Sequence, residues 1–296
     1  MNIIIIILIF ILVLFIYLHI FYHLKTSDDL EVYELSTLPK ERLEEICDLR
    51  QPLTFYLDTS KFEKLTKENI LNNYPSFDIK LRDTLKNNSD TELFLPIILT
   101  KGFTVLSEDT KQKFISENNG DFLEETSLIK TFKANDEFLR PNMLATTNYD
   151  YIMGSQNSIT PFRYELNYRN YLFLLSGKVK VKLSPPKSSK YLHQIKDYDN
   201  FEFRSPINVW NIQDEYKIDF DKIKCMEITL EPGKILFIPA YWWYSLKFED
   251  KQSTILSFKY RTYMNTIAIF PHIFTSFLQK QNIKHNIQNI VNTKNE

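Results

Sequence analysis

The chain has 296 residues, of which 44% are hydrophobic and 25% are charged, and its formal net charge is −1 at pH 7. This length and apolar content are sufficient to bury the core of one large domain. The near-neutral charge gives no electrostatic basis for binding nucleic acid. The two cysteines, Cys47 and Cys225, are too few for a disulfide framework, which favours a reducing compartment for the main domain.

The first element expected along the chain is a membrane helix, because Ile3 to Tyr22 forms an uncharged, almost wholly apolar run. At about 1.5 Å rise per residue, this run covers the roughly 30 Å core of a bilayer. A cleaved signal peptide is disfavoured because no basic segment precedes the run and no small-residue cleavage site follows it. Lys25, just after the run, favours a single-pass anchor with the main domain on the cytoplasmic side. Three aromatic residues at its C-terminal end match an interfacial belt: Tyr17, Phe21 and Tyr22.

After the anchor at residues 1–24 and a spacer at 25–34, local patterns predict an N-terminal α/β part over residues 35–144. A helix is expected over 35–46, because Ser36 or Thr37 is available as its cap and acidic residues occupy its early turns. Side-chain patterns predict five more elements, which are strands over 51–56, 93–99 and 103–106 and helices over 67–74 and 110–125.

Residues 171–183 predict a β-hairpin, because apolar side chains recur with a period of two on both sides of Ser176-Gly177. Lys178, Lys180 and Lys182 fall on the opposite face, where a solvated edge is favoured over an anion-binding stripe. Three more strands are expected, with a tight turn at 231–233, over residues 226–230, 234–239 and 254–260.

The C-terminal segment, residues 263–296, predicts two helices. Apolar residues recur at roughly helical intervals from Asn265 to Val291, and Pro271 interrupts the series.

Two segments carry the strongest functional signal, Ser158–Glu165 and Ile238–Tyr244. The first resembles the T-P-x-H-x-D motif, and the second the I-P-x-x-W-W-H motif, of the JmjC and cupin-like family of Fe(II)- and 2-oxoglutarate-dependent oxygenases. In this resemblance three residues stand in place of the iron ligands: Arg163 for the first His, Glu165 for the Asp and Tyr244 for the second His.

Other parts of the chain resemble the same family, including the helix before Gln51-Pro52 and the segment Ala134–Pro141. The resemblance implies a mainly β fold with flanking helices, with a double-stranded β-helix (a cupin or jelly-roll barrel) over residues 145–262. The Trp242-Trp243 pair is interpreted as packing for that barrel more than as a ligand contact.

The replacements remove the chemistry of an iron site. Non-haem Fe(II) takes two neutral imidazoles and one carboxylate on one face of its coordination sphere. A guanidinium has no lone pair to donate, so Arg163 would repel a divalent cation and is suited to pair with Glu165 or with a bound anion. Tyr244 would first have to lose a proton whose reference pKa is about 10. The sequence therefore predicts no metal and no cofactor.

Histidines elsewhere do not rebuild the site. The chain has five, and none is spaced from another ligand-type residue as in a metal motif: His19, His23, His193, His272 and His285.

The resemblance also implies a vestigial cosubstrate pocket. In the family a Thr before the first His, an Asn opening the next strand and a Lys after the hairpin Gly hold 2-oxoglutarate. Thr160 and Asn170 match the first two, whereas the lysine position falls on Val179, with Lys178 adjacent. Ser257 stands where close relatives often have Asn. The predicted vestigial pocket therefore comprises Thr160, Arg163, Glu165, Asn170, Lys178, Tyr244 and Ser257.

These features predict a membrane-anchored cupin-like protein without oxygenase activity that acts as a binding or scaffolding module. The expected partners are the bilayer and an unknown protein or small anionic ligand, with no nucleic acid. The C-terminal helices either pack on their own barrel or, as the resemblance allows, form a homodimer. Two alternatives remain open: an enzyme with a relocated metal site or a metal-free reaction at Arg163 and Tyr244, and a membrane protein whose barrel is only a stable body.

Overall fold

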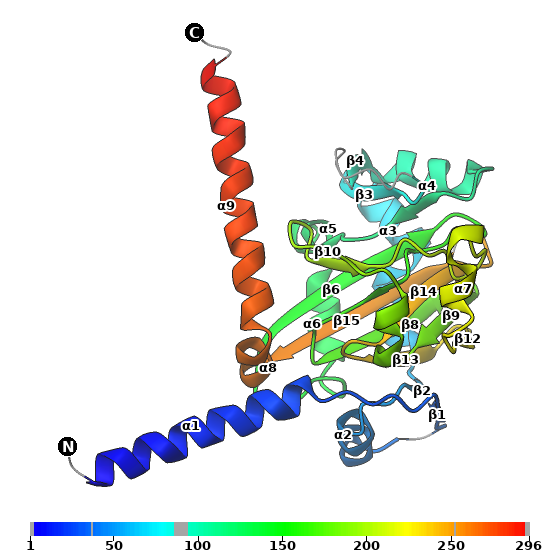
Figure 1. The fold of residues 1–296 in the computed structure, drawn as a ribbon. Coiled ribbons are helices and arrows are strands. Elements are labelled where there is room, and N and C mark those ends of the chain that lie inside the picture. The colour runs from blue at the N-terminus through cyan, green and yellow to red at the C-terminus, as the bar shows by residue number, and fades with distance from the viewer. Residues whose placement is uncertain (1–2, 37, 86–93, 252, 294–296) are drawn as a thin grey trace.

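The computed structural model describes residues 3–36, 38–85, 94–251 and 253–293. Within these residues, the main body consists of two β-sheets that face each other, with helices on the outer side of the larger sheet (Figure 1). The mainly β body with flanking helices that the sequence predicts is confirmed at this level.

The larger sheet has nine described strands. Their order across the sheet is β1 (Tyr33–Glu34), β2 (Leu53–Tyr56), β13 (Lys234–Pro239), β8 (Arg169–Ser176), β15 (Thr254–Thr262), β6 (Leu144–Gly154), β5 (Phe114–Ser116), β3 (Asp78–Asp83) and β4 (Leu95–Ile98). The smaller sheet has six described strands, in the order β10 (Ile195–Asp197), β11 (Glu202–Arg204), β7 (Arg163–Tyr164), β14 (Trp243–Phe248), β9 (Val179–Ser184) and β12 (Met226–Leu230).

The two sheets enclose an apolar core, since alternate residues of facing strands point between them. Strands β8 and β9 both form where the sequence predicts them, but the predicted hairpin is wrong, because β8 pairs in the larger sheet and β9 in the smaller one. Val179, Val181 and Leu183 of β9 are fully buried in this core. The alternating lysines of β9 point outward, where Lys180 pairs with Glu227 and Glu249. The period of two therefore placed this strand correctly.

A second core lies between the larger sheet and the helices that cover its outer face. Most predicted elements of this part are found within a few residues of their expected bounds. The covering helices are α2 (Lys40–Asp48), α3 (Lys67–Asn73), α4 (Leu99–Glu108), α5 (Gly120–Glu125), α6 (Ile129–Asn135) and the 3-10 helix η1 (Thr59–Leu65). Three short helical segments lie on the side of the smaller sheet: η2 (Pro186–Tyr191), η3 (Asp214–Tyr216) and α7 (Lys217–Phe220).

The helix predicted over 35–46 begins later than expected, at Lys40 in α2. Pro39 occupies the N-cap position and no side chain caps the helix by a hydrogen bond, so the proposed cap at Ser36 is wrong. The other proposed cap, Thr37, lies outside the described residues. Proline is favoured around a helix start because its fixed φ suits the first turn.

The strand predicted over 103–106 is wrong, because these residues lie inside helix α4. The residues that α4 buries, Leu99, Gly102 and Leu106, have the i, i+3, i+7 spacing of one helix face. Gly102 lets the helix approach the sheet closely, since a Cβ there would lie 2.6 Å from the Ile79 side chain. Tertiary packing therefore outweighs the local alternation that indicated a strand.

The helix predicted over 110–125 is only partly correct, because its first half forms strand β5 and its last residues form α5. The Asp109 carboxylate accepts hydrogen bonds from the backbone N–H groups of Lys113 and Phe114 at 2.7 and 2.9 Å, which fixes a turn before β5. Strand β5 then pairs with both β3 and β6. This pairing carries Glu117, the residue after β5, to the mouth of the barrel.

Helix α1 (Ile3–Leu24) is the one described helix that is long and apolar enough to cross a membrane. Its C-terminal end is tied to the main body by aromatic contacts. The His23 ring lies 5.0 Å from the Tyr168 ring, and the Arg50 guanidinium lies 5.2 Å from the Tyr22 ring centre. The two predicted C-terminal helices are confirmed as α8 (Tyr263–Ala268), which contacts α1, and α9 (Phe270–Thr293).

We expect Gly177→Ala to lower the free energy of unfolding by about 2 to 5 kcal/mol, through a left-handed backbone and an overpacked turn. Gly177 has φ +80°, and a Cβ there would lie 2.7 Å from the Ser253 Cα. Chemical denaturation of the detergent-solubilised full chain measures this loss.

Gly233→Ala is the matched control, since Gly233 has φ +88° but a Cβ there would lie no closer than 3.4 Å to any neighbouring atom. Its loss should be limited to the backbone strain, about 1 to 2 kcal/mol. Equal losses in the two variants would show that the contact with Ser253 is unimportant.

Candidate functional site

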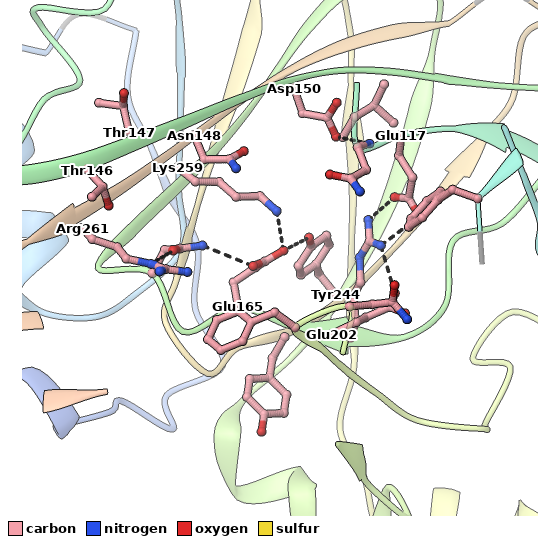
Figure 2. A pocket seen from close by; sticks show the side chains of 18 residues that line it. Glu117, Thr146, Thr147, Asn148, Asp150, Glu165, Glu202, Tyr244, Lys259 and Arg261 are labelled. Carbon is pink, nitrogen blue, oxygen red and sulfur yellow. Dashed lines mark hydrogen bonds and ion pairs between the residues drawn. The ribbon is translucent and has the colours of Figure 1, made fainter. Parts of the chain in front are cut away.

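The three residues that, by the motif resemblance, stand at the positions of iron ligands come together in space. Arg163 of β7 lies directly opposite Tyr244 of β14 in the smaller sheet, and Glu165 is the first residue after β7. All three line a cavity of about 400 Å³ to which strands of both sheets contribute (Figure 2). The spacing of the two motifs in the sequence therefore identified one real location.

Arg163 does not pair with Glu165, contrary to one of the expectations from sequence. Its guanidinium forms a bidentate pair with Glu117, at 3.0 and 2.5 Å, and a further contact with Glu202 at 3.2 Å. Arg82 of β3 bonds to the same two carboxylates, at 2.9 Å to Glu117 and 2.7 Å to Glu202. These four buried side chains form what we call the buried ion cluster: Arg82, Glu117, Arg163 and Glu202.

Both carboxylates of the buried ion cluster are held in the ionised form. Burial by itself would raise their pKa values, but the attraction of Arg163 and Arg82 outweighs it and lowers the pKa of Glu117. The same balance lowers the pKa of Glu202 to about 2, with a further contribution from Arg204. Two carboxylates and two guanidiniums thus neutralise one another in a largely buried position.

The residue that neutralises Glu165 is Lys259 of β15. Its ammonium lies 2.6 Å from Glu165 Oε1, and the Tyr244 hydroxyl donates a hydrogen bond to the same oxygen at 3.2 Å. The side-chain amide of Asn167 donates to the other carboxylate oxygen at 3.2 Å. Burial opposes the charge of Lys259, yet Glu165 and Tyr244 raise the pKa of its ammonium above the usual value. The lysine is therefore charged at neutral pH.

Lys259 thus forms the ion pair with Glu165 that the sequence analysis had suggested for Arg163. The cation next to the motif's carboxylate is the Lys259 ammonium from the larger sheet (Figure 2). The Arg163 guanidinium instead pairs with Glu117. A period of two along β15 puts Lys259 on the same face as Ser257. Alternation in the sequence could therefore have identified Lys259 as a candidate site residue. No local pattern pointed to the cluster residues Arg82, Glu117 and Glu202.

Tyr244 is poorly suited to bind a metal. Burial raises the pKa of its hydroxyl to about 12, although Arg163 acts in the opposite direction. The Arg163 guanidinium lies 5.7 Å from the centre of the Tyr244 ring, within the range of a cation–π contact. At neutral pH Tyr244 is therefore a neutral phenol that donates a hydrogen bond.

The remaining residues of the predicted pocket do not line the cavity. Thr160 Oγ1 accepts a hydrogen bond from the Leu246 backbone N–H at 2.8 Å, which ties its segment to β14. Asn170 donates to the Ile238 carbonyl at 3.2 Å, and the Ser257 hydroxyl is buried. Lys178 lies in the exposed connection between β8 and β9, where its ammonium is 3.4 Å from Glu249.

The cavity also contains a cation that the sequence pattern did not single out, Arg261 at the end of β15. Its Nε donates to Asn167 Oδ1 at 2.6 Å, and its guanidinium lies 5.2 Å from the Phe201 ring centre. Within the described residues, Arg261 forms no ion pair with a carboxylate. Burial lowers the pKa of its guanidinium, with Glu165 partly opposing. Polar residues of β6 line the same part of the cavity: Thr146, Thr147 and Asn148.

No histidine whose side chain the structure describes lines this cavity. His193 pairs with Asp219 at 2.9 Å on the surface, and His272 Nδ1 lies 3.0 Å from the Tyr198 hydroxyl. The side chain of His285 is outside the described part of the structure. Among the described residues, no three His, Cys, Asp or Glu side chains converge to hold a metal ion. The donor set around Glu165 therefore does not fit the Fe(II) that the resemblance implies.

Comparison with known proteins gives a match of residues 39–265 to the family described as cupin-like domain. HSPB1-associated protein 1 from Rattus norvegicus is 29% identical over 99 residues, which cover 33% of this chain and 21% of that protein. The protein of the same name from Homo sapiens gives 29% over 99 residues, covering 33% and 20%. JmjC domain-containing protein D from Dictyostelium discoideum is 28% identical over 95 residues, covering 32% and 21%. The chain thus covers about one fifth of the length of these relatives.

The buried ion cluster predicts how stability depends on pH. The pKa of Glu202 is about 2 in the folded chain and about 4.3 in an unfolded chain. Its contribution of about 3 kcal/mol is complete above the unfolded pKa and is lost as the pH falls through the folded pKa. Unfolding by urea between pH 2.5 and pH 6 should therefore show stability that declines below about pH 4.3.

The Glu202→Gln variant should show a flatter decline in the same pH range, because an amide does not titrate. Glu137→Gln is a suitable control, since Glu137 is an exposed glutamate, and it should keep the slope of the natural chain. Identical slopes for all three proteins would exclude a depressed pKa at Glu202.

Proposed function

Because the chain belongs to the cupin-like domain family, we propose that it is a membrane-anchored binding or scaffolding module without oxygenase activity. The observation that carries this proposal is the contact between Lys259 and Glu165 at 2.6 Å. The one carboxylate that remains in the motif is neutralised by a side chain of the same protein, so it has no charge left to offer a divalent cation.

Electrostatics supports the absence of an iron site. An entering Fe(II) would meet the ammonium of Lys259 and the guanidinium of Arg163, and it would have to displace Lys259 from Glu165. It would gain only one carboxylate, since Tyr244 is a neutral phenol and Arg163 has no lone pair. The cost of separating a partly buried ion pair then has no compensating set of ligand bonds.

A binding role is supported by the cavity that remains. A barrel that served only as a stable body would be expected to fill this space with its own aromatic side chains, whereas a cavity of about 400 Å³ stays open between polar walls. Relatives of the chain are named for association with HSPB1, which supports a binding function for this kind of domain.

The ligand class that the cavity suits is a small anion. Arg261 supplies an uncompensated guanidinium among the described residues, and hydroxyl and amide groups of β6 line the same region. A guanidinium can bind carboxylate or phosphate through two parallel hydrogen bonds. This assignment moves the anion contact from Arg163, whose two terminal nitrogens already pair with Glu117 and Glu202, to Arg261.

The membrane part of the proposal rests on α1. Its side chains are exposed along most of the helix, and its length and composition suit a bilayer. Burial of this apolar surface in lipid is the favourable alternative to its exposure to water. Lys25 after the helix favours a cytoplasmic location for the main domain.

The alternative, an oxygenase with a relocated or atypical site, lacks a specific supporting observation. A metal-free reaction with Tyr244 as proton donor is also disfavoured, because a hydroxyl whose pKa is about 12 is a weak acid at neutral pH.

We expect the purified full chain to bind no stoichiometric Fe(II) and to show no decarboxylation of 2-oxoglutarate. Metal content after anaerobic incubation with Fe(II) and succinate formation are the two measurements. A family member that retains the H-x-D and H ligands serves as the positive control. One equivalent of iron together with turnover would overturn the proposal.

Binding of an anion is tested separately with Arg261→Gln. Succinate and inorganic phosphate are the probes, and calorimetry on the full chain in detergent measures their affinity. Loss of one charge-assisted contact should weaken binding by roughly tenfold, about 1.4 kcal/mol.

The matched control is Lys178→Gln, which removes the same charge from the outer face of the barrel. It should leave the affinity unchanged. Equal affinity of the Arg261→Gln variant and the natural chain would place the anion elsewhere or exclude it.

A further inference from the structure

Helix α9 leaves the main body at the point where α1 joins it. The short helix α8, which directly precedes α9, contacts α1, and the first turns of α9 pack on the segment around Tyr198. Figure 1 shows that α9 then extends away from this corner, crosswise to the direction of α1 and beyond the two sheets. The C-terminal end of α1 and the N-terminal end of α9 therefore meet the main body at the same corner, but the two helices run in different directions.

One face of α9 presents large apolar side chains to the surroundings. The exposed fractions are 56% for Phe270, 48% for Phe274, 56% for Phe277 and 47% for Leu278. Their spacing of i, i+4, i+7 and i+8 keeps them on one side of the helix. The opposite side faces the body, where the Ser276 hydroxyl donates to the Tyr198 carbonyl at 2.7 Å and His272 lies against Tyr198.

This apolar face continues toward the membrane anchor. Tyr263 and Ile267 of α8 are also exposed, and so is Met143. Met143 lies next to α8, since the Tyr263 backbone N–H donates a hydrogen bond to the Met143 carbonyl at 3.2 Å. Exposed aromatic residues at the C-terminal end of α1, Tyr17 and Phe21, follow on the neighbouring helix. The exposed apolar surface therefore runs from α1 through α8 into α9.

The charge of α9 suits a lipid surface. Its sequence from Phe270 to Thr293 contains two lysines, Lys280 and Lys284, and no Asp or Glu. Interfacial helices combine an apolar face with basic residues that are attracted to anionic lipid headgroups. A second copy of the chain would cover the α9 face but would not explain its continuity with the anchor.

We propose that α9 lies on the surface of the bilayer that α1 crosses, with Phe270, Phe274, Phe277 and Leu278 inserted at the boundary between headgroups and acyl chains. This inference rests on the proposed membrane anchor. A helix across the bilayer and a second helix along its surface fix the rotation of the barrel relative to the membrane, which one anchor cannot do.

The test measures the depth of single labelled positions in the full chain. Cys47 and Cys225 are replaced by Ala, and a bimane fluorophore is attached at Phe277→Cys, Gln279→Cys or Phe10→Cys. Each protein is placed as a single copy in lipid nanodiscs of phosphatidylcholine and phosphatidylserine that contain doxyl-labelled lipids. Gln279 lies on the other side of α9 from Phe277 by helical spacing, so it is the matched control.

We expect quenching at position 277 to exceed that at position 279 by roughly twofold or more, as for a helix that lies in the interface plane. Quenching at position 10 with none at 277 would overturn the inference and leave the anchor intact. Absence of quenching at position 10 would instead refute the anchor. Energy transfer between copies labelled at 277 in detergent, without quenching in nanodiscs, would identify α9 as a dimer contact and overturn the inference.

Discussion

The interior of this barrel is organised by full charges that must neutralise one another. Taking a guanidinium or a carboxylate out of water costs several kcal/mol unless a partner with good geometry is present. In the buried ion cluster each arginine touches both carboxylates, and its residues come from β3, β7, β11 and the end of β5. Because removing any member leaves an unpaired buried charge, the cluster ties the edge of the larger sheet to the smaller one.

The contact between Lys259 and Glu165 follows the same constraint at the other side of the cavity. The motif resemblance aligns Glu165 with a carboxylate that binds a metal cation in the oxygenases. Here an ammonium from β15 supplies the positive charge, at 2.6 Å from the carboxylate. A covalently attached cation stabilises the fold without a supply of metal, but it has no open coordination position for a substrate. Under the proposed function, this one ion pair accounts both for the absence of oxygenase chemistry and for the retained shape.

Much of the architecture could be predicted from local sequence, with informative exceptions. The strands β8 and β9 and the two C-terminal helices follow from the period of apolar residues, but the period did not reveal that β8 and β9 belong to different sheets. The segment around Phe103 was misassigned because its alternation is short, and packing of Gly102 against Ile79 decides for a helix. The polar segment before Glu117 was misassigned because its backbone groups pair with two distant strands, which residue composition does not reveal.

The sequence by itself determined that α1 is a long apolar helix. Through the motif resemblance, it also brought together Arg163, Glu165 and Tyr244 as one predicted site. Only the tertiary structure decided which partner each charge takes. Arg163 reaches Glu117 across 46 positions of the chain, and Lys259 reaches Glu165 across 94. Periodicity reports the face on which a side chain lies, because it reflects local backbone geometry. The choice among several opposite charges on that face depends on how distant strands are aligned.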